Sequence, residues 1–120
     1  MQPALLKKIG VYLYALPMIY FGLMHLTYAP SMESMMPAYF PVKVLFVYLT
    51  GVLLIATGVS IILQKYVKLT CQLLGLMFMI FVLLIHLPSV IGGNPMSLPN
   101  ILKDSALAGA AFIFSANSQE

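Results

Sequence analysis

The stretch that decides the fold is LTCQLLGLMFMIFVLLIHLP, which runs from Leu69 to Pro88. Positions 73 to 85 carry no polar side chain, lysines stand just before the stretch, and a proline ends it. An α-helix rises about 1.5 Å per residue, so positions 69 to 87 are about long enough to cross a hydrocarbon core of roughly 30 Å. The stretch therefore predicts a membrane-spanning helix with a histidine, His86, at one end.

The composition of the whole chain agrees with a membrane protein. Of its 120 residues, 62% are hydrophobic and 8% are charged, whereas about a quarter of an ordinary globular domain is charged. Every positive side chain is a lysine, and no basic patch or aromatic-interleaved stripe of the kind that binds nucleic acid is present. Cys71 is the single cysteine, so it cannot form an intramolecular disulfide, and we interpret it as a small apolar residue within a helix.

Three other apolar stretches repeat this design, so the chain is predicted to form one integral membrane domain, residues 1–120. The first stretch is longer than the apolar part of a secretory signal, and no small-x-small cleavage site follows it. We therefore expect a retained helix there. The predicted spans cover residues of about 9–26, 42–63, 69–87 and 99–116.

Two of these spans carry small residues at helical spacing. In the second span Thr50-Gly51 recurs as Thr57-Gly58. In the fourth span Ser105 and Gly109 form one small-xxx-small pair, and Ala106 and Ala110 form another. Small residues let helix backbones approach closely within a membrane, so both stripes predict tight helix packing.

Residues 27–41 connect the first two spans and contain three prolines, which break any long helix. Residues 31–36 are enough for one or two turns, and we expect this short segment to lie in the headgroup region.

The lysines predict an orientation. If the first and third helices leave the cytoplasm, four lysines lie on the cytoplasmic side and two on the outer side, which agrees with the positive-inside rule. The four are Lys7, Lys8, Lys65 and Lys68, and the two are Lys43 and Lys103. The predicted fold is therefore all-α: a four-helix transmembrane bundle, N-in/C-in, with a short interfacial segment between helices 1 and 2.

The same geometry gathers four polar side chains at the outer end of the bundle. His25 lies 17 residues after Lys8, and His86 lies 18 residues after Lys68, so both histidines reach a depth of about 25 Å. Lys103 and Asp104 enter the fourth helix from that same side. Ionisable groups at membrane depth usually face an interior or a cavity. His25, His86, Lys103 and Asp104 are therefore the candidate ligand-binding residues; the alternative is that the histidines only bond across helices or lie among headgroups.

No metal centre is predicted at this end. Axial haem ligation needs small residues beside each histidine, and Met24, Leu26, Ile85 and Leu87 offer none. Thioethers select Cu(I), but methionine is also a common gap-filler in packed or lipid-facing surfaces. The methionines expected on the outer side are Met24, Met32, Met35, Met36 and Met96. No hydrolytic motif, phosphate loop or cysteine pair is present, so no catalytic residue is assigned, and whether the chain is an enzyme stays open.

Five segments resemble DoxX-like membrane proteins, whose pattern begins roughly G-x-x-H-φ and continues P-x-φ-φ-P, with φ an apolar residue. They are FGLMHL (21–26), MPAYFP (36–41), YLTG (48–51, continuing to Gly58), HLP (86–88) and KDSALAG (103–109). In order, they resemble the family's first helix, its linker, its second helix, the end of its third and the start of its fourth. The chain differs from some relatives in that it has no arginine in helix 1 and no tryptophan. It is also shorter than the two-domain thiosulfate enzyme.

The resemblance implies a multi-pass protein of the bacterial cytoplasmic (inner) membrane. Founding members are subunits of a terminal quinol oxidase and a thiosulfate:quinone oxidoreductase, which implies a quinone as ligand and a membrane redox partner. The leading interpretation is an accessory or quinone-associated subunit of a membrane redox system. The alternative is a non-redox structural or small-solute transport protein with a polar vestibule on its outer face. Besides the lipid bilayer, a redox partner or a homo-oligomer is expected, and nucleic acid is not.

Overall fold

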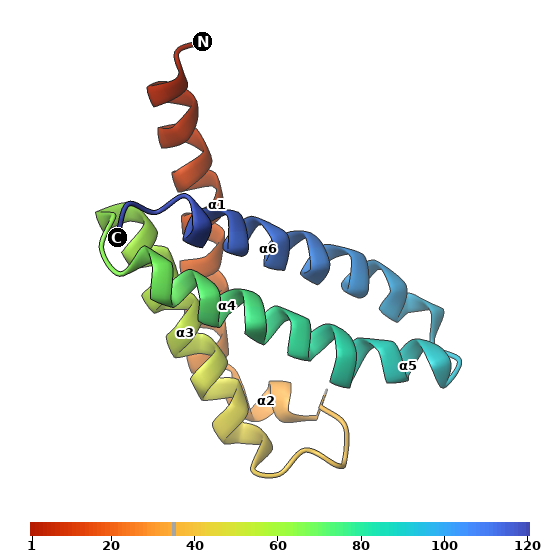
Figure 1. The fold of residues 1–120 in the computed structure, drawn as a ribbon. Helices are drawn as coiled ribbons and strands as arrows, with labels where there is room; N and C mark the ends of the chain where they lie inside the picture. The colour runs from red at the N-terminus through yellow and green to blue at the C-terminus, as the bar shows by residue number, and fades with distance from the viewer. Residues whose placement is uncertain (35) are drawn as a thin grey trace.

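The computed structural model describes residues 1–34 and 36–120, and the elements assigned in these ranges are helical. They are α1 (Pro3–Thr27), α2 (Ala29–Glu33), α3 (Lys43–Leu63), α4 (Val67–Phe81), the π-helical turn η1 (Val82–His86), α5 (Leu87–Ile91), the 3₁₀ turn η2 (Pro95–Ser97) and α6 (Leu98–Ala116) (Figure 1). The all-α prediction is confirmed. The short segment expected between the first two spans is α2, which begins two residues earlier than predicted and holds Pro30 in its first turn, where proline fits a helix.

Three helical stretches in the described ranges are long and apolar enough to cross a membrane: Pro3–Thr27, Lys43–Leu63 and Val67–Ile91. They indicate a multi-pass membrane protein. The predicted fourth span corresponds to α6, whose 19 residues extend about 28 Å. The first half of α6 contains Asn100, Lys103 and Asp104, which lower the mean hydropathy of the helix. Helix α6 is not one of the three candidate spans.

Two helices extend beyond the spans predicted for them. The first helix begins at Pro3 rather than near residue 9, because proline at a helix start forfeits no intrahelical bond and the lysines that follow are compatible with a helix. The third helix does not end at Leu87 but continues past Pro88 to Ile91, through η1 and α5.

The contacts of Leu84 explain how the helix passes through this proline. Pro88 has no backbone N–H, so the carbonyl of Leu84, four residues earlier, loses its ordinary helical partner. The hydroxyl of Tyr39, from the segment that precedes α3, donates a hydrogen bond to that carbonyl. The π-helical turn at residues 82–86 lies at the same place. Pro88 therefore lies beside a local change of helix type. The carbonyl of Leu84, which has lost its helical partner, accepts its hydrogen bond from outside the helix.

The long helices form two antiparallel pairs, α1 with α3 and α4 with α6 (Figure 1). In the first pair the backbones touch: a Cβ atom added to Gly22 would lie 2.7 Å from the carbonyl oxygen of Gly51, and one added to Gly58 would lie 2.9 Å from that of Ala15. Thr50 and Thr57 are buried beside these glycines. The tight packing predicted for the second span is confirmed.

The tight packing predicted for the small residues of α6 is wrong. Ser105, Ala106 and Gly109 are exposed, and a Cβ atom added to Gly109 would meet no atom within 4 Å. The buried face of α6 is formed instead by residues spaced four, three and four apart, as one helix face requires. They are Asp104, Ala108, Ala111 and Ser115.

The two pairs meet along a buried core and at Tyr14. The Tyr14 hydroxyl on α1 donates a 2.8 Å hydrogen bond to the carbonyl of Leu107 on α6, and its ring lies 5.1 Å from that of Phe114. Cys71 is fully buried in this core, which agrees with the interpretation of its thiol as a small apolar group. From the α3–α4 turn the pairs diverge (Figure 1), and the candidate site lies between them.

Candidate functional site

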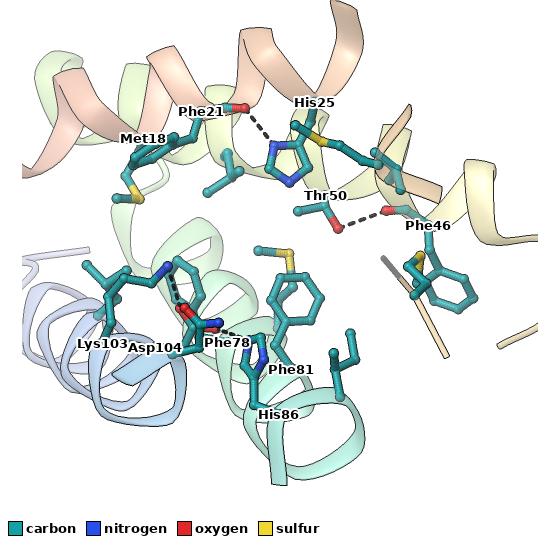
Figure 2. Close-up of a pocket in the computed structure, with 18 residues that line it drawn as sticks. Met18, Phe21, His25, Phe46, Thr50, Phe78, Phe81, His86, Lys103 and Asp104 are labelled. Atoms are coloured by element: carbon teal, nitrogen blue, oxygen red, sulfur yellow. Dashed lines mark hydrogen bonds and ion pairs between the residues drawn. The ribbon is translucent and has the colours of Figure 1, made fainter. Parts of the chain in front are cut away.

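A cavity of about 370 Å³ lies between the two helix pairs, and residues of α1, α2, α3, α4, η1 and α6 line it (Figure 2). This volume is within the usual range for small-molecule sites. All four candidate residues stand at its wall: His25 on α1, His86 on η1, and Lys103 and Asp104 on α6. The structure thus brings together the side chains that the sequence placed at one depth. That they bind a ligand stays a prediction.

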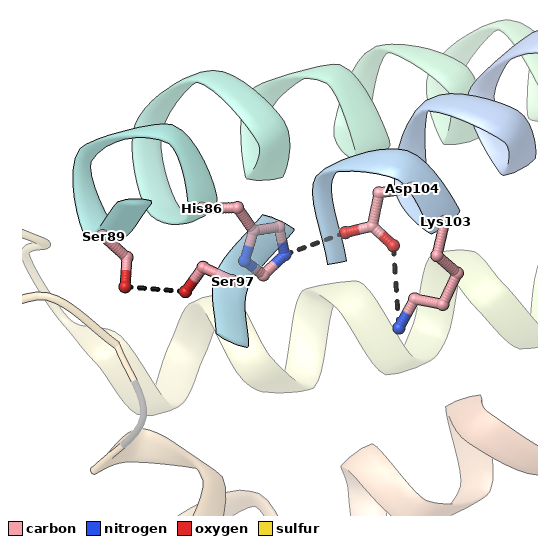
Figure 3. A network of polar contacts seen from close by, with 5 residues as sticks. All are labelled: His86, Ser89, Ser97, Lys103 and Asp104. Atoms are coloured by element: carbon pink, nitrogen blue, oxygen red, sulfur yellow. Dashed lines mark hydrogen bonds and ion pairs between the residues drawn. The ribbon is translucent and has the colours of Figure 1, made fainter. Parts of the chain in front are cut away.

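A side-chain hydrogen bond at the wall of the cavity joins His86 to Asp104. Nε2 of His86 lies 2.9 Å from Oδ2 of Asp104, and Nζ of Lys103 lies 3.9 Å from the other carboxylate oxygen (Figure 3). Asp104 is 5% exposed, whereas the side chain of Lys103 is 64% exposed. A buried carboxylate is stable only with partners that replace its water. His86 and Lys103 supply them.

Local structure positions both members of this pair. Asp104 belongs to the face of α6 that packs against α4. His86 is the last residue of η1, where the wider hydrogen-bonded ring of a π-helical turn redirects the side chains that follow. Beyond η1, the Ser97 hydroxyl donates a 2.7 Å hydrogen bond to that of Ser89, which ties the loop before α6 to α5 (Figure 3). The entry of α6 is thereby fixed relative to His86.

His25 stands on the opposite wall of the cavity, on α1 (Figure 2). Its Nδ1 donates a 2.6 Å hydrogen bond to the carbonyl of Phe21, one helical turn earlier. The other ring nitrogen, Nε2, is directed towards the cavity (Figure 2). His25 is therefore oriented by its own helix, whereas His86 is oriented by a neighbouring one.

The rest of the wall is mostly aromatic and sulfur-bearing. Four phenylalanines line it, and the rings of Phe78 and Phe81 pack edge to face with their centroids 6.4 Å apart. The hydroxyl of Thr50 points to the carbonyl of Phe46 and donates to it at 2.8 Å. The wall is thus mostly apolar, with polar groups at a few positions, as is usual for small-molecule sites.

The structure separates the methionines that could have formed a copper site. Met32 and Met36 line the cavity, Met96 is 74% exposed elsewhere, and Met35 lies outside the described residues. Met18 and Met77, which the sequence did not single out, also line the cavity. In residues 1–34 and 36–120 no three His, Cys, Asp or Glu side chains are grouped as metal ligands. That the site holds no metal stays a prediction.

Sequence reasoning also missed Asn100 and the aromatic lining. Asn100 lies one turn before Asp104 on α6, at the same wall. The sequence could have indicated Asn100, because a polar residue one helical turn from an acidic one lies on the same helix face. The phenylalanines gave no signal, because aromatic residues are common throughout a membrane span.

Fold and cavity together define a class: a small helical membrane protein with an aromatic-lined cavity between two helix pairs. No family model, curated protein or solved structure matches this chain.

Proposed function

We propose that this chain is a DoxX-like integral membrane protein that binds the ring of a quinone between its helix pairs, as an accessory subunit of a membrane redox system. The observation that carries the proposal is the hydrogen-bonded pair of His86 and Asp104 on the wall of an aromatic-lined cavity, with His25 opposite. A quinone is flat and apolar and carries an oxygen at each end. The phenylalanines suit its faces, and polar side chains on two walls suit its oxygens.

The chemistry of the histidines supports this ligand. A quinone exchanges protons when its redox state changes, and imidazole gains or loses a proton near neutral pH. The pair of His86 with a carboxylate holds the imidazole in one orientation, as such pairs do elsewhere. The cavity residues then serve to bind and orient the ring, and no catalytic residue is assigned.

A membrane orientation follows within the same proposal. With α1 and α4 leaving the bacterial cytoplasm and α3 and α6 returning, both termini are cytoplasmic and the cavity lies in the outer half of the inner membrane. Helix α6 is the fourth span. Its buried carboxylate, Asp104, faces α4 and the cavity rather than lipid, which is how membrane helices accommodate such groups.

The alternative is a non-redox structural or small-solute transport protein. Transport needs a polar path through the molecule, whereas most of the lining residues, the buried Leu54 and Phe78 among them, are apolar. Homo-oligomerisation through the stripe around Gly51 and Gly58 is disfavoured, since α1 already covers that stripe. A mostly apolar lining favours ligand binding over transport.

The test is to purify the protein gently in detergent, extract its lipids and identify quinones by mass spectrometry. The proposal expects a bound quinone at a molar ratio that Asp104→Asn lowers several-fold. Glu33→Gln, which changes an exposed acidic residue on α2, serves as the control and should leave the ratio unchanged. Absence of quinone from the wild-type protein, with no rise in melting temperature on adding menadione, would refute the proposal.

A further inference from the structure

A second, smaller cavity of about 200 Å³ lies between α1 and the end of α3. It is at the opposite end of this helix pair from His25. Its polar lining residues are Lys7, Lys8 and Tyr12 on α1 and Gln64, which directly follows α3. The function proposed above makes no use of this cavity, which we call the lysine crevice.

The crevice exists because α1 extends past the end of α3. The close contact between Gly58 and the carbonyl of Ala15 fixes the register of these antiparallel helices. Helix α3 ends at Leu63, shortly after Gly58, so its end lies level with about residue 10 of α1. Residues 1–10 are all exposed, and Figure 1 shows this part of α1 projecting beyond the other helices. The two lysines therefore stand at the step where α1 continues without α3.

The positive charge of the crevice is not neutralised within the chain. In residues 1–34 and 36–120 the ion pairs of Asp104 are with His86 and Lys103, at the other end of the molecule. Glu120 is the acidic side chain near the crevice end, and its oxygens accept hydrogen bonds from the backbone N–H groups of Tyr66 and Lys68. The crevice is therefore open to an anion from outside the chain.

The lysines are not needed to cap α3. Cations often lie at helix C-termini, where backbone carbonyls lack partners. Here the carbonyls of Ser60 and Ile61 accept hydrogen bonds from the backbone N–H groups of Lys65 and Gln64. The side-chain amide of Gln64 also donates to the carbonyl of Ile61, and its second hydrogen remains for another acceptor. The last turn of α3 thus finds partners in its own chain, which leaves the ammonium groups in the crevice to a ligand.

The crevice also has an apolar side. Val11, which is 7% exposed, and the partly buried Ile62 both line it. The uncharged part of the first candidate span begins directly after Lys8, so the lysines stand where the hydrocarbon core of a membrane meets its headgroup layer. A ligand that suits both sides of the crevice has an anionic group and an attached hydrocarbon part.

We infer that the lysine crevice binds the headgroup of an anionic phospholipid. The ammonium groups of Lys7 and Lys8 attract the phosphate. The hydroxyl of Tyr12 and the second amide hydrogen of Gln64 are further donors to its oxygens. The glycerol and the first methylene groups lie against the apolar side. One lipid bound in this way contacts both α1 and α3, so it stabilises the pair of helices.

The experiment compares two phospholipids with the same dioleoyl chains: phosphatidylglycerol, which is anionic, and phosphatidylcholine, which has no net charge. The full chain is purified in a neutral detergent, and native mass spectrometry measures lipid binding over a range of concentrations. A lysine near an anionic lipid surface contributes about fivefold in affinity. We therefore expect the wild-type protein to bind phosphatidylglycerol at least about fivefold more tightly than phosphatidylcholine.

Two double variants test whether the crevice itself is the site. Lys7→Gln combined with Lys8→Gln should bring the affinities for the two lipids within about twofold of each other. The matched control combines Lys65→Gln with Lys68→Gln. It removes the same charge from the same end of the molecule but not from the crevice, so it should keep the preference for phosphatidylglycerol. All four lysines are exposed, and both variants should fold.

Three results would overturn the inference. The first is equal binding of the two lipids by the wild-type protein. The second is an equal loss of preference in both double variants, since the attraction would then come from the overall charge of this end. The third is a rise in melting temperature with inorganic phosphate as large as that with phosphatidylglycerol, which would show a site for free anions. The larger cavity shares no lining residue with the crevice, so these results leave the proposed function untouched.

Discussion

The side chains of His86 and Asp104, 18 residues apart in the sequence, meet at 2.9 Å and join the end of η1 to the buried face of α6. Removing the histidine leaves the carboxylate with the exposed Lys103 as its one charged neighbour among residues 1–34 and 36–120. Loss of one partner from a buried ion pair costs about 3–5 kcal/mol. Because His86 is partly exposed, the free-energy cost of losing it is smaller. We therefore expect His86→Ala to lower the unfolding free energy by about 2–3 kcal/mol. Unfolding by denaturant titration in detergent measures it.

A double-mutant cycle checks that this loss belongs to the pair. In the Asp104→Ala background, His86→Ala should cost less than about 1 kcal/mol, since the bond is already gone. Equal costs of His86→Ala in both backgrounds would show that the two side chains do not stabilise each other.

The glycine contact between α1 and α3 makes a second prediction. A methyl group on Gly58 would lie 2.9 Å from the carbonyl oxygen of Ala15 and closer still to the side chain of Ile19. Overpacking of this kind costs about 1–3 kcal/mol, so Gly58→Ala should lower the melting temperature. Gly109→Ala is the matched control: its methyl group meets nothing within 4 Å, and alanine favours a helix by about 1 kcal/mol, so the melting temperature should not fall. A fall for Gly109→Ala and none for Gly58→Ala would contradict this helix pairing.

The hydrogen bond from Tyr39 to Leu84 makes a third prediction. Because Pro88 supplies no N–H group to the Leu84 carbonyl, Tyr39→Phe should leave that carbonyl without its donor and destabilise the protein by about 0.5–1.5 kcal/mol. Pro88→Ala restores an N–H group four residues after Leu84. In that background Tyr39→Phe should cost much less. Thermal unfolding of the four proteins tests this, and an equal cost with proline or alanine at position 88 would refute it.

Glu120 makes stability depend on pH. Its carboxylate accepts hydrogen bonds from the backbone N–H groups of Lys68 and Tyr66 at the start of α4. The bond from Lys68, followed by those from Ser118 and the neighbouring amides, holds the pKa of Glu120 below its ordinary value. Because the pKa of Glu120 is lower in the folded protein than in the unfolded chain, these hydrogen bonds stabilise the fold fully at pH values above the unfolded-state pKa. The stabilisation is lost as the pH falls through the folded-state pKa.

The corresponding measurement compares melting temperatures from neutral pH to below about pH 4, the region of an ordinary glutamate pKa. We expect Glu120→Gln to melt below the wild-type protein at neutral pH and the difference to shrink as the pH falls. Glu33→Gln removes a different exposed carboxylate and should show no such convergence. A difference for Glu120→Gln that stays constant with pH would contradict the assigned bonds.

Much of this arrangement could be predicted from the sequence because helices have a fixed rise. Counting residues from Lys8 and Lys68 placed His25 and His86 at one depth, and both line one cavity. The small-residue stripe of α3 could also be predicted, because glycine two turns from glycine has few uses in a membrane helix other than close packing.

Other features could not be predicted because they depend on contacts distant in the sequence. Continuation of the helix through Pro88 involves a hydroxyl 45 residues before Leu84. The pairing of His86 with Asp104 depends on which face of α6 turns towards α4. Small residues occur on two faces of α6, and the stripe through Ser105 and Gly109 is the exposed one. Spacing alone does not distinguish these faces, since both repeat with the helical period.

The most direct test of the central claim is the melting temperature of the protein in nanodiscs with and without menadiol or menadione. A ligand present at a hundred times its Kd stabilises the folded state by about 2.7 kcal/mol. We predict a rise of several degrees for the wild-type protein and for Glu33→Gln, and a much smaller rise for Asp104→Asn. No rise in the wild-type protein with either form of the ring would contradict quinone binding between the helix pairs.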